Sequence, residues 1–579
     1  MKESVSIFGA GGRTREIITE IKKKYRILLV VDNASQKWGD IIDCYKVEPP
    51  NKLVETRADY IVIVSSYWRQ ILRQLYREFG IEYAYVLVQG NETGEISSGY
   101  TFKRVCGRPL FLDMQPSQKV GAYDFRTMEG VGVRTGNDRG RVLFIAYHFP
   151  PMGASPVQRT LKFVKYLSRM GYKVTVLTAT DSRYAFSDQT LIRDIPENVT
   201  VIRVPDLYKE PSELSYKEQQ DILDFLCCID RSESYVEAIK TAQEEQVLYT
   251  LPDRNVMWAI KTYRSINELV DISSFSVIYS TAPYWCPHIL CYLLKMQYGV
   301  PWIADYRDPW AASTEYIDAV YPFMTPQEVV LSRDIERRIL EKVDAIIVAG
   351  ENWTNMFREQ YAISDDRLFV ISNGYDEEDF TNIEFCLSKN EKFTLCYNGL
   401  LGYNRRPEVI LKAIAQLIED GLIAKESIQW IFNGEEDEKR CREEIEAFDK
   451  YGIAIMNGMI PHQRSIEIAM QSDLMVLFGE KGSMARLNYP GKFYEYLRMG
   501  RPILCISDSD SPQAEILGKT GMGVNFGFDN HNGIKDYIRK LYVSWKNSSR
   551  MTPIYNDRIK QYSREALAKK LASIVDDLR

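Results

Sequence analysis

The feature that most constrains this chain is an apolar run that ends in glycine or a polar residue and leads into an amphipathic helix. It recurs along most of the sequence, for example in "SVSIFGAGG" near the start and in "SIQWIFNGEED", "LMVLFGEKG" and "PILCISDSD" near the end. Strands that alternate with helices form parallel sheets covered by crossover helices. The sequence therefore predicts an α/β protein with doubly wound sheets.

Composition changes divide this pattern into three α/β segments, which suits a length of 579 residues. The predicted parts, in chain order, are a Rossmann-like N-terminal module (1–100), a linker (101–140), an N-lobe (141–385, with a helical insertion at about 205–270), a C-lobe (386–555) and a C-terminal amphipathic helix (556–579). We expect the insertion to shape a substrate site.

Bulk composition excludes several classes of protein. The net charge of −6 gives no basis for general nucleic-acid binding. No apolar run reaches the roughly 18 residues of a spanning helix, and the start lacks the apolar segment of a signal peptide. Ten cysteines without a C-x-x-C pair and four histidines without a cluster predict a cytoplasmic protein with reduced thiols and no bound metal.

The first glycine turn has features of a nucleotide site. Gly9, Gly11 and Gly12 would let the backbone approach a phosphate at a helix N-terminus, and Asp32 stands where a ribose-binding acid would lie. Thr14 replaces the third glycine of that pattern, so a tight turn without a ligand is the alternative. The "FGAGG" turn and "VVDN" strand end resemble the nucleotide-sugar-binding N-terminal domain of PglD-type sugar O-acyltransferases.

Five motifs in the remaining chain occur in a recognisable order. They are "YHFPPMGASPVQRTLKFVKYLSRMGYKVTVLT", "DYRDPW", "NGYD", "YNGLLGYNRRPEVIL" and "YPGKFYEYLRMGRPIL". Together they resemble the GT-B glycosyltransferases of family 4 over about residues 141–560. The resemblance implies two Rossmann-like domains facing a cleft, preceded here by the additional small module.

The resemblance also implies an activity. It is transfer of a hexose-type sugar from an NDP-sugar, with UDP favoured, to a hydroxyl, without metal and with retention at the anomeric carbon. No cofactor is expected. The implied acceptor is a saccharide or lipid-linked precursor of a surface polysaccharide. Two alternatives remain: a nucleotide-sugar 2-epimerase-like reaction, or a sensor or scaffold that binds nucleotide sugar without turnover.

The family pattern assigns donor-binding roles to five residues. Gly153 in the glycine loop and either Arg405 or Arg406 would contact the diphosphate, Lys492 would face the phosphate or the sugar, and Glu495 would accept from the ribose hydroxyls. A proline-rich turn at Gly153 and a surface ion pair between Lys492 and Glu495 are the structural alternatives.

One position departs from the family pattern. The first glutamate of E-x7-E falls at Leu487, and that residue contacts the donor sugar in the family. Glu480, Arg486 and Asn488 are the candidates to replace it, and the choice among them stays open.

The acceptor side offers three candidate catalytic residues. Asp305 and Asp308 in "DYRDPW" follow an apolar strand, and His148 lies in the first loop of the N-lobe. Either carboxylate would orient or deprotonate the acceptor hydroxyl, or would form a buried pair with Arg307. For His148 the alternative is a structural histidine.

A basic stripe is predicted on the first helix of the N-lobe. Arg159, Lys162, Lys165 and Arg169 project within about 120° of one another. Such a stripe would meet anionic lipid at the inner face of a membrane, in a peripheral association, or it would be a solvated helix face.

Overall fold

The computed structural model covers three sheets and their helices. It describes residues 4–10, 12–56, 58, 60–64, 71, 75, 83–89, 100–106 and 139–579, less 154, 181–186, 207–212, 245–250, 321–323, 382, 384–389, 400–404, 435–442, 444 and 549–552. The chain forms two compact units, residues 1–114 with 316–330 and residues 115–315 with 331–579.

The N-terminal module is a seven-stranded sheet in the order β3-β4-β2-β1-β5-β6-β7, parallel except for the β3–β4 and β6–β7 pairs. Val5, Ile7 and Ile21 lie in its core. Its last strand falls inside the predicted linker, so the module extends beyond residue 100. Its elements are β1 (Ser4–Phe8), α1 (Gly12–Lys24), β2 (Arg26–Val31), β3 (Ile41–Ile42), β4 (Tyr45–Glu48), α2 (Lys52–Glu55), β5 (Tyr60–Ile63), β6 (Tyr83–Gln89) and β7 (Tyr100–Cys106).

The N-lobe is a parallel seven-stranded sheet in the order β10-β9-β8-β11-β12-β13-β14. The predicted insertion forms three helices, α5, α6 and α7. The lobe's elements are β8 (Arg141–Ile145), α4 (Ser155–Arg169), β9 (Lys173–Thr180), β10 (Thr200–Pro205), α5 (Tyr216–Cys227), α6 (Glu233–Glu244), α7 (Val256–Leu269), β11 (Val277–Ala282), α8 (Cys286–Tyr298), β12 (Trp302–Tyr306), α9 (Thr314–Val320), α10 (Pro326–Leu340), β13 (Ala345–Val348), α11 (Glu351–Tyr361) and β14 (Leu368–Val370).

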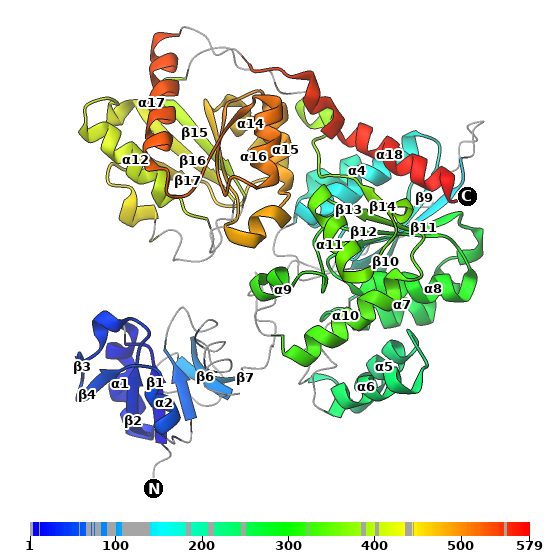
Figure 1. Ribbon diagram of the computed structural model, residues 1–579, viewed down its shortest axis with the longest axis horizontal. Helices are drawn as coiled ribbons and strands as arrows, with labels where there is room; N and C mark the ends of the chain where they lie inside the picture. The colour runs from blue at the N-terminus through cyan, green and yellow to red at the C-terminus, as the bar shows by residue number, and fades with distance from the viewer. Residues whose placement is uncertain are drawn as a thin grey trace. The chain divides into compact units, whose positions relative to one another are not determined.

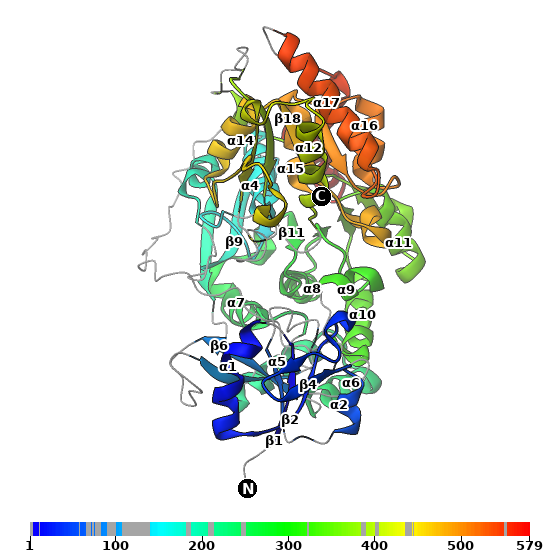
Figure 2. The ribbon, with the colours of Figure 1, turned by 90° about the vertical axis from the view of Figure 1, so that its left-hand side faces the viewer.

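The C-lobe is a parallel six-stranded sheet in the order β17-β16-β15-β18-β19-β20. Helices α12 and α17 lie side by side on one face, and α14, α15 and α16 cover the other (Figures 1 and 2). The elements are β15 (Phe393–Asn398), α12 (Glu408–Glu419), β16 (Ile428–Asn433), β17 (Ala454–Met456), α14 (His462–Gln471), β18 (Leu474–Phe478), α15 (Gly491–Met499), β19 (Ile503–Ile506), α16 (Pro512–Thr520), β20 (Gly523–Phe526) and α17 (His531–Asn547).

The last helix of the chain belongs to the N-lobe. The predicted single helix over 556–579 is divided: a 3₁₀ turn (Asp557–Tyr562) is followed by α18 (Arg564–Asp577). The division falls at Ser563, whose side chain accepts from the Ala566 N–H and caps α18. The apolar face of α18 then packs beside α4 in the N-lobe core (Figure 1).

These observations confirm the expected fold class: two doubly wound parallel sheets, with a further small sheet domain at the N-terminus. Because the strands of each lobe are parallel, their carboxyl ends meet at one edge, where loops form ligand sites. Within the described residues, no helix is long and apolar enough to cross a membrane.

Candidate active site

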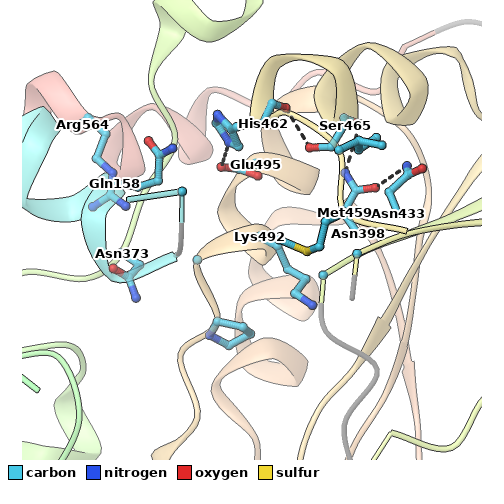
Figure 3. Close-up of a pocket in the computed structure, with 16 residues that line it drawn as sticks. Gln158, Asn373, Asn398, Asn433, Met459, His462, Ser465, Lys492, Glu495 and Arg564 are labelled. Atoms are coloured by element: carbon cyan, nitrogen blue, oxygen red, sulfur yellow. Dashed lines mark hydrogen bonds and ion pairs between the residues drawn. The ribbon is translucent and has the colours of Figure 1, made fainter. Parts of the chain in front are cut away.

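A cavity of about 250 Å³ lies where N-lobe loops and the carboxyl ends of the C-lobe strands meet (Figure 3). It includes three residues predicted for the donor site, Gly153, Lys492 and Glu495. The lining residues are Gly153, Gln158, Asn373, Asn398, Gly399, Asn433, Gly434, Met459, Ile460, His462, Ser465, Pro490, Gly491, Lys492, Glu495 and Arg564.

The N-terminus of α15 opens into this cavity without a capping side chain. Its N-cap residue is Pro490, which has no side-chain acceptor. The amides of Gly491 and Lys492 donate to no group in the described part of the chain. Free amides and the positive end of a helix dipole form an anion-binding site. The α15 terminus therefore suits a phosphate.

Lys492 adds a positive charge at the same place. Its Nζ donates to the Tyr397 hydroxyl at 3.0 Å and lies 4.3 Å from the centre of that ring. Among the described residues it has no carboxylate partner, so its charge is not neutralised by an ion pair. Figure 3 shows the side chain extending into the cavity. An ammonium held in this way is available to a ligand anion.

Two glycines make room for this arrangement at the ends of β15 and β16. Gly399 has a φ of +116°, and a Cβ there would lie 2.3 Å from Lys492 Nζ. Gly434 has a φ of +150°, and its Cβ would lie 2.3 Å from the Gly399 carbonyl oxygen. Both backbones can come this close only without a side chain.

Glu495 forms an ion pair that the sequence analysis missed. Its Oε1 lies 2.8 Å from His462 Nε2, and both side chains are mostly buried. Burial lowers the pKa of His462, but the carboxylates of Glu495 and Asp379 outweigh it and raise the pKa to about 9. Burial also opposes ionisation of Glu495, yet His462 leaves the pKa of Glu495 below its usual value. The pair is therefore ionised at neutral pH, which replaces the predicted Lys492–Glu495 surface pair.

We expect this ion pair to make stability depend on alkaline pH. Because the pKa of His462 is about 9 in the folded chain and about 6.5 when unfolded, its contribution is complete below pH 6.5 and is lost as pH rises through 9. The loss is at most about 3 kcal/mol. Urea unfolding at pH 6, 7.5 and 9.5 should show this decline in the free energy of unfolding for the wild type and not for His462→Gln. The exposed His531→Gln is the matched control, and an equal decline in His462→Gln would contradict the assignment.

Arg405 and Arg406 do not line the cavity. Arg405 Nη1 donates to Glu480 Oε1 at 2.6 Å, and Glu480 also accepts from Asn488. Arg406 pairs with Glu408 on the surface. In the described geometry both guanidiniums are therefore held by carboxylates of the C-lobe, and their predicted phosphate contacts remain predictions.

The departure at Leu487 lies in a short 3₁₀ turn just before α15. Its carbonyl accepts from the Trp353 indole at 3.2 Å. Of the three proposed replacements, Glu480 accepts from both Asn488 and Arg405, whereas Arg486 pairs with Asp510. None of these three candidates is among the residues that line the described cavity, and the choice among them stays open.

His148, Arg307 and Asp308 are brought together at the carboxyl ends of β8, β11 and β12. The His148 ring lies 5.0 Å from that of Tyr284, and burial with Arg307 nearby lowers the pKa of His148 to about 3. Burial raises the pKa of Asp308 to about 6 against the attraction of Arg307. His148 is thus neutral at physiological pH, whereas the pKa of Asp308 lies about one unit below physiological pH.

Asp305 is held in a buried pair, and its partner is Arg159 rather than Arg307. Both carboxylate oxygens accept from the Arg159 guanidinium, at 2.7 and 2.8 Å, and Tyr279 and Thr281 donate to the same group. Asp305 has no exposed surface. Burial opposes its ionisation, but Arg159 leaves the pKa of Asp305 lowered. The structural alternative therefore describes Asp305 better than a catalytic role.

The predicted lipid-facing stripe is wrong for three of its four residues. Arg159, Lys162 and Lys165 are each only 1% exposed. The two lysines pair with acidic residues in the segment after β14 and in the 3₁₀ turn between β9 and β10. Arg169 is half exposed and pairs with Glu378. A buried cation cannot meet a membrane surface. The lysines' acidic partners are Asp194, Asp376, Asp379 and Glu378.

The glycine turn of the N-terminal module satisfies its own polar groups. Asp32 accepts from the Ala10 N–H at 2.7 Å, the Ala34 N–H at 2.8 Å and Lys37 Nζ at 3.0 Å. Gly9 has a φ of +116° and its N–H donates to Val31. Gly12 begins α1, and Gly11 lies outside the described residues. This geometry favours the tight turn over the predicted ligand site.

Comparisons with known proteins identify two regions. Residues 156–374 match the model of the glycosyl transferase 4-like domain, and residues 1–87 match that of the C2185-like N-terminal domain. No curated protein matches the chain. A glycosyl transferase 4-like domain is therefore present in the N-lobe, as the resemblance implied; the PglD-like resemblance of the N-terminal module is not confirmed and stays a prediction.

Solved structures resemble the chain at low identity. HepE from Anabaena with UDP and glucose is 11% identical, with a TM-score of 0.44 over 76% of this chain and 96% of that one. Sucrose-phosphate synthase from Thermosynechococcus elongatus is 14% identical, with a TM-score of 0.46 over 76% of this chain and 99% of that one. WaaG, a glycosyltransferase involved in lipopolysaccharide biosynthesis, is 12% identical, with a TM-score of 0.47 over 75% of this chain and 99% of that one. The assignment therefore rests on the family model and the sheets themselves.

Proposed function

We propose that this chain, which carries a glycosyl transferase 4-like domain, is a GT-B glycosyltransferase that transfers a sugar from a UDP-sugar to a hydroxyl group at the cavity described above. The acceptor in this proposal is a saccharide or lipid-linked precursor of a surface polysaccharide. The observation that carries the proposal is the uncapped N-terminus of α15 beside Lys492 in the cavity.

The diphosphate of the donor binds at that terminus. The free amides of Gly491 and Lys492 donate to its oxygens, and the Lys492 ammonium lies beside them. The leaving nucleoside diphosphate gains negative charge as the glycosidic bond breaks. Groups already fixed at this position stabilise the transition state more than the ground state, so they increase the rate and not only the affinity.

The ribose hydroxyls bind to Glu495. One carboxylate oxygen is occupied by His462, which fixes the side chain, and the other accepts no hydrogen bond from the described residues. A fixed carboxylate accepts from adjacent hydroxyls without losing much conformational freedom on binding. His462 is thus a positioning residue for Glu495.

The acceptor binds on the N-lobe side, where Asp308 and His148 lie at the ends of β12 and β8. With a pKa of about 6, Asp308 is mostly ionised at neutral pH, and it can take a proton from an acceptor hydroxyl. His148 is neutral and orients the acceptor through a ring nitrogen. Retention at the anomeric carbon follows the family resemblance and is part of the proposal.

A binding and turnover panel on the full chain tests this function. UDP-, GDP-, ADP- and TDP-sugars are titrated by calorimetry, and donor breakdown is followed with and without saccharide acceptors. We expect one donor to bind and Glu495→Ala to weaken it by about 10- to 100-fold through the loss of charged hydrogen bonds. Glu467→Ala, which removes a partly exposed carboxylate from α14, should bind as the wild type does.

Other outcomes would replace the proposal. Conversion of the donor to an isomer without an acceptor would establish the epimerase alternative. Binding without hydrolysis or transfer under any condition would favour a sensor. Donor affinity that does not change in Glu495→Ala would show that the donor does not bind in this cavity.

A further inference from the structure

Arg564 is a buried arginine that reaches the cavity from the far end of the chain. It is the first residue of α18, and its N–H donates to the Tyr375 carbonyl at 2.7 Å, which fixes the start of the helix. Its side chain is only 4% exposed and lines the cavity with Gln158 and Glu495 (Figure 3). A residue predicted only as part of a C-terminal helix therefore belongs to the site.

The guanidinium of Arg564 has no partner within the described part of the chain. No hydrogen bond or ion pair reaches it, and its Nη1 is completely buried without an acceptor. Arg159, a comparably buried arginine of the same lobe, donates to Asp305 and to the carbonyls of Ile371 and Ser372. Buried arginines are normally satisfied in this way, so an unsatisfied one that faces a cavity points to a ligand.

Nearby carboxylates attract this charge, but within the described residues none of them forms an ion pair with Arg564. Glu495 is paired with His462, and Asp376 and Asp379 are paired with Lys162. Burial and the neighbouring Arg159 lower the pKa of Arg564 to about 10, which still leaves it charged at neutral pH. The cavity therefore contains a second cation, separate from Lys492, without an anion of its own.

We propose that Arg564 binds phosphate oxygens of a substrate in the cleft. A guanidinium forms two parallel hydrogen bonds with a phosphate, and phosphate is the anion that the proposed substrates carry. The inference rests on the proposed function. Two sources supply that chemistry: the diphosphate of the nucleotide-sugar donor and the phosphate of a lipid-linked acceptor.

The test compares Arg564→Gln and Arg564→Lys with Arg558→Gln, which removes an exposed arginine six residues earlier. Calorimetry measures UDP, uridine and inorganic pyrophosphate, and then a short prenyl diphosphate in the presence of saturating UDP. Thermal unfolding of each unliganded protein is recorded in parallel. Lys492→Ala serves as the reference for loss of the donor site.

We expect Arg564→Gln to weaken UDP or the prenyl diphosphate by about 10- to 100-fold and uridine by less than twofold. Loss of UDP affinity assigns Arg564 to the donor, and loss of prenyl diphosphate affinity alone assigns it to the acceptor. The unliganded melting temperature should stay equal or rise, because an unpaired buried charge has been removed. Arg564→Lys should be intermediate, and Arg558→Gln should match the wild type.

Two results would overturn the inference. One is wild-type affinity of Arg564→Gln for UDP, pyrophosphate and the prenyl diphosphate while Lys492→Ala loses UDP, which would leave the proposed function intact. The other is a lower melting temperature with equal loss of UDP and uridine, which is the signature of a structural arginine. If the wild type binds no nucleoside diphosphate, the proposed function fails, and Arg564 is decided by pyrophosphate and the prenyl diphosphate alone.

Discussion

Replacement of Lys492 with alanine should lower kcat/KM for the donor by about 100- to 1,000-fold, the range found when one preorganised charge-stabilising group is removed from an active site. The reason is its position: Nζ contacts the Tyr397 hydroxyl and ring, has no carboxylate partner among the described residues, and belongs to the first turn of α15, whose N-terminus is uncapped. Most of the loss should appear in kcat, because the charge on the leaving group grows in the transition state. Steady-state kinetics with the donor identified by the panel measures both constants.

Lys425→Ala is the matched control for this experiment. It removes a lysine from the same lobe that is more than half exposed and lies 3.9 Å from Glu426. Its kinetics should equal those of the wild type. A change in kcat/KM of less than fivefold in Lys492→Ala would mean that the α15 terminus does not hold the diphosphate.

Replacement of Asp305 with alanine should destabilise the protein by about 3–5 kcal/mol, the usual effect of removing one partner of a buried ion pair. Arg159 would keep the carbonyl acceptors of Ile371 and Ser372 and lose the Asp305 carboxylate. Tyr279 and Thr281 would lose the acceptor that they share. Urea unfolding at pH 7 measures the change in the free energy of unfolding.

Asp308→Asn separates the structural carboxylate at the end of β12 from the candidate catalytic carboxylate that follows it. Because burial raises the pKa of Asp308, its ionised form is disfavoured in the folded chain, and a neutral amide should not lower stability. Its activity should nevertheless fall if it accepts the acceptor's proton. A small loss of stability in Asp305→Ala together with a large one in Asp308→Asn would reverse the two assignments.

The donor end of the cavity was predictable because its signal is local. Gly491, Lys492 and Glu495 lie within five consecutive residues, and the turn, the helix start and the charges appear together in one motif. Asn398 and Asn433 had a weaker signal of the same kind, since each ends an apolar strand in an Asn-Gly pair and both line the cavity.

Residues that meet only through the fold had no such signal. His462 is 33 residues from Glu495, and Arg564 comes from a helix that packs in the other lobe. Helical spacing correctly placed Lys162 and Lys165 on one face but did not reveal what covers that face. The acidic run "DEED" at 376–379 was the available clue, because buried lysines need nearby carboxylates.

The return of α18 to the N-lobe has a consequence for synthesis of the chain on the ribosome. The lobe begins at β8, yet its core includes Leu567, Leu571 and Val575. Until those residues have left the exit tunnel, the apolar face of α4 and the adjacent strands lack part of their cover, while the C-lobe between them can already fold. The N-lobe is therefore started before the C-lobe and finished after it, and its nascent form exposes apolar surface that chaperones bind throughout translation of the C-lobe.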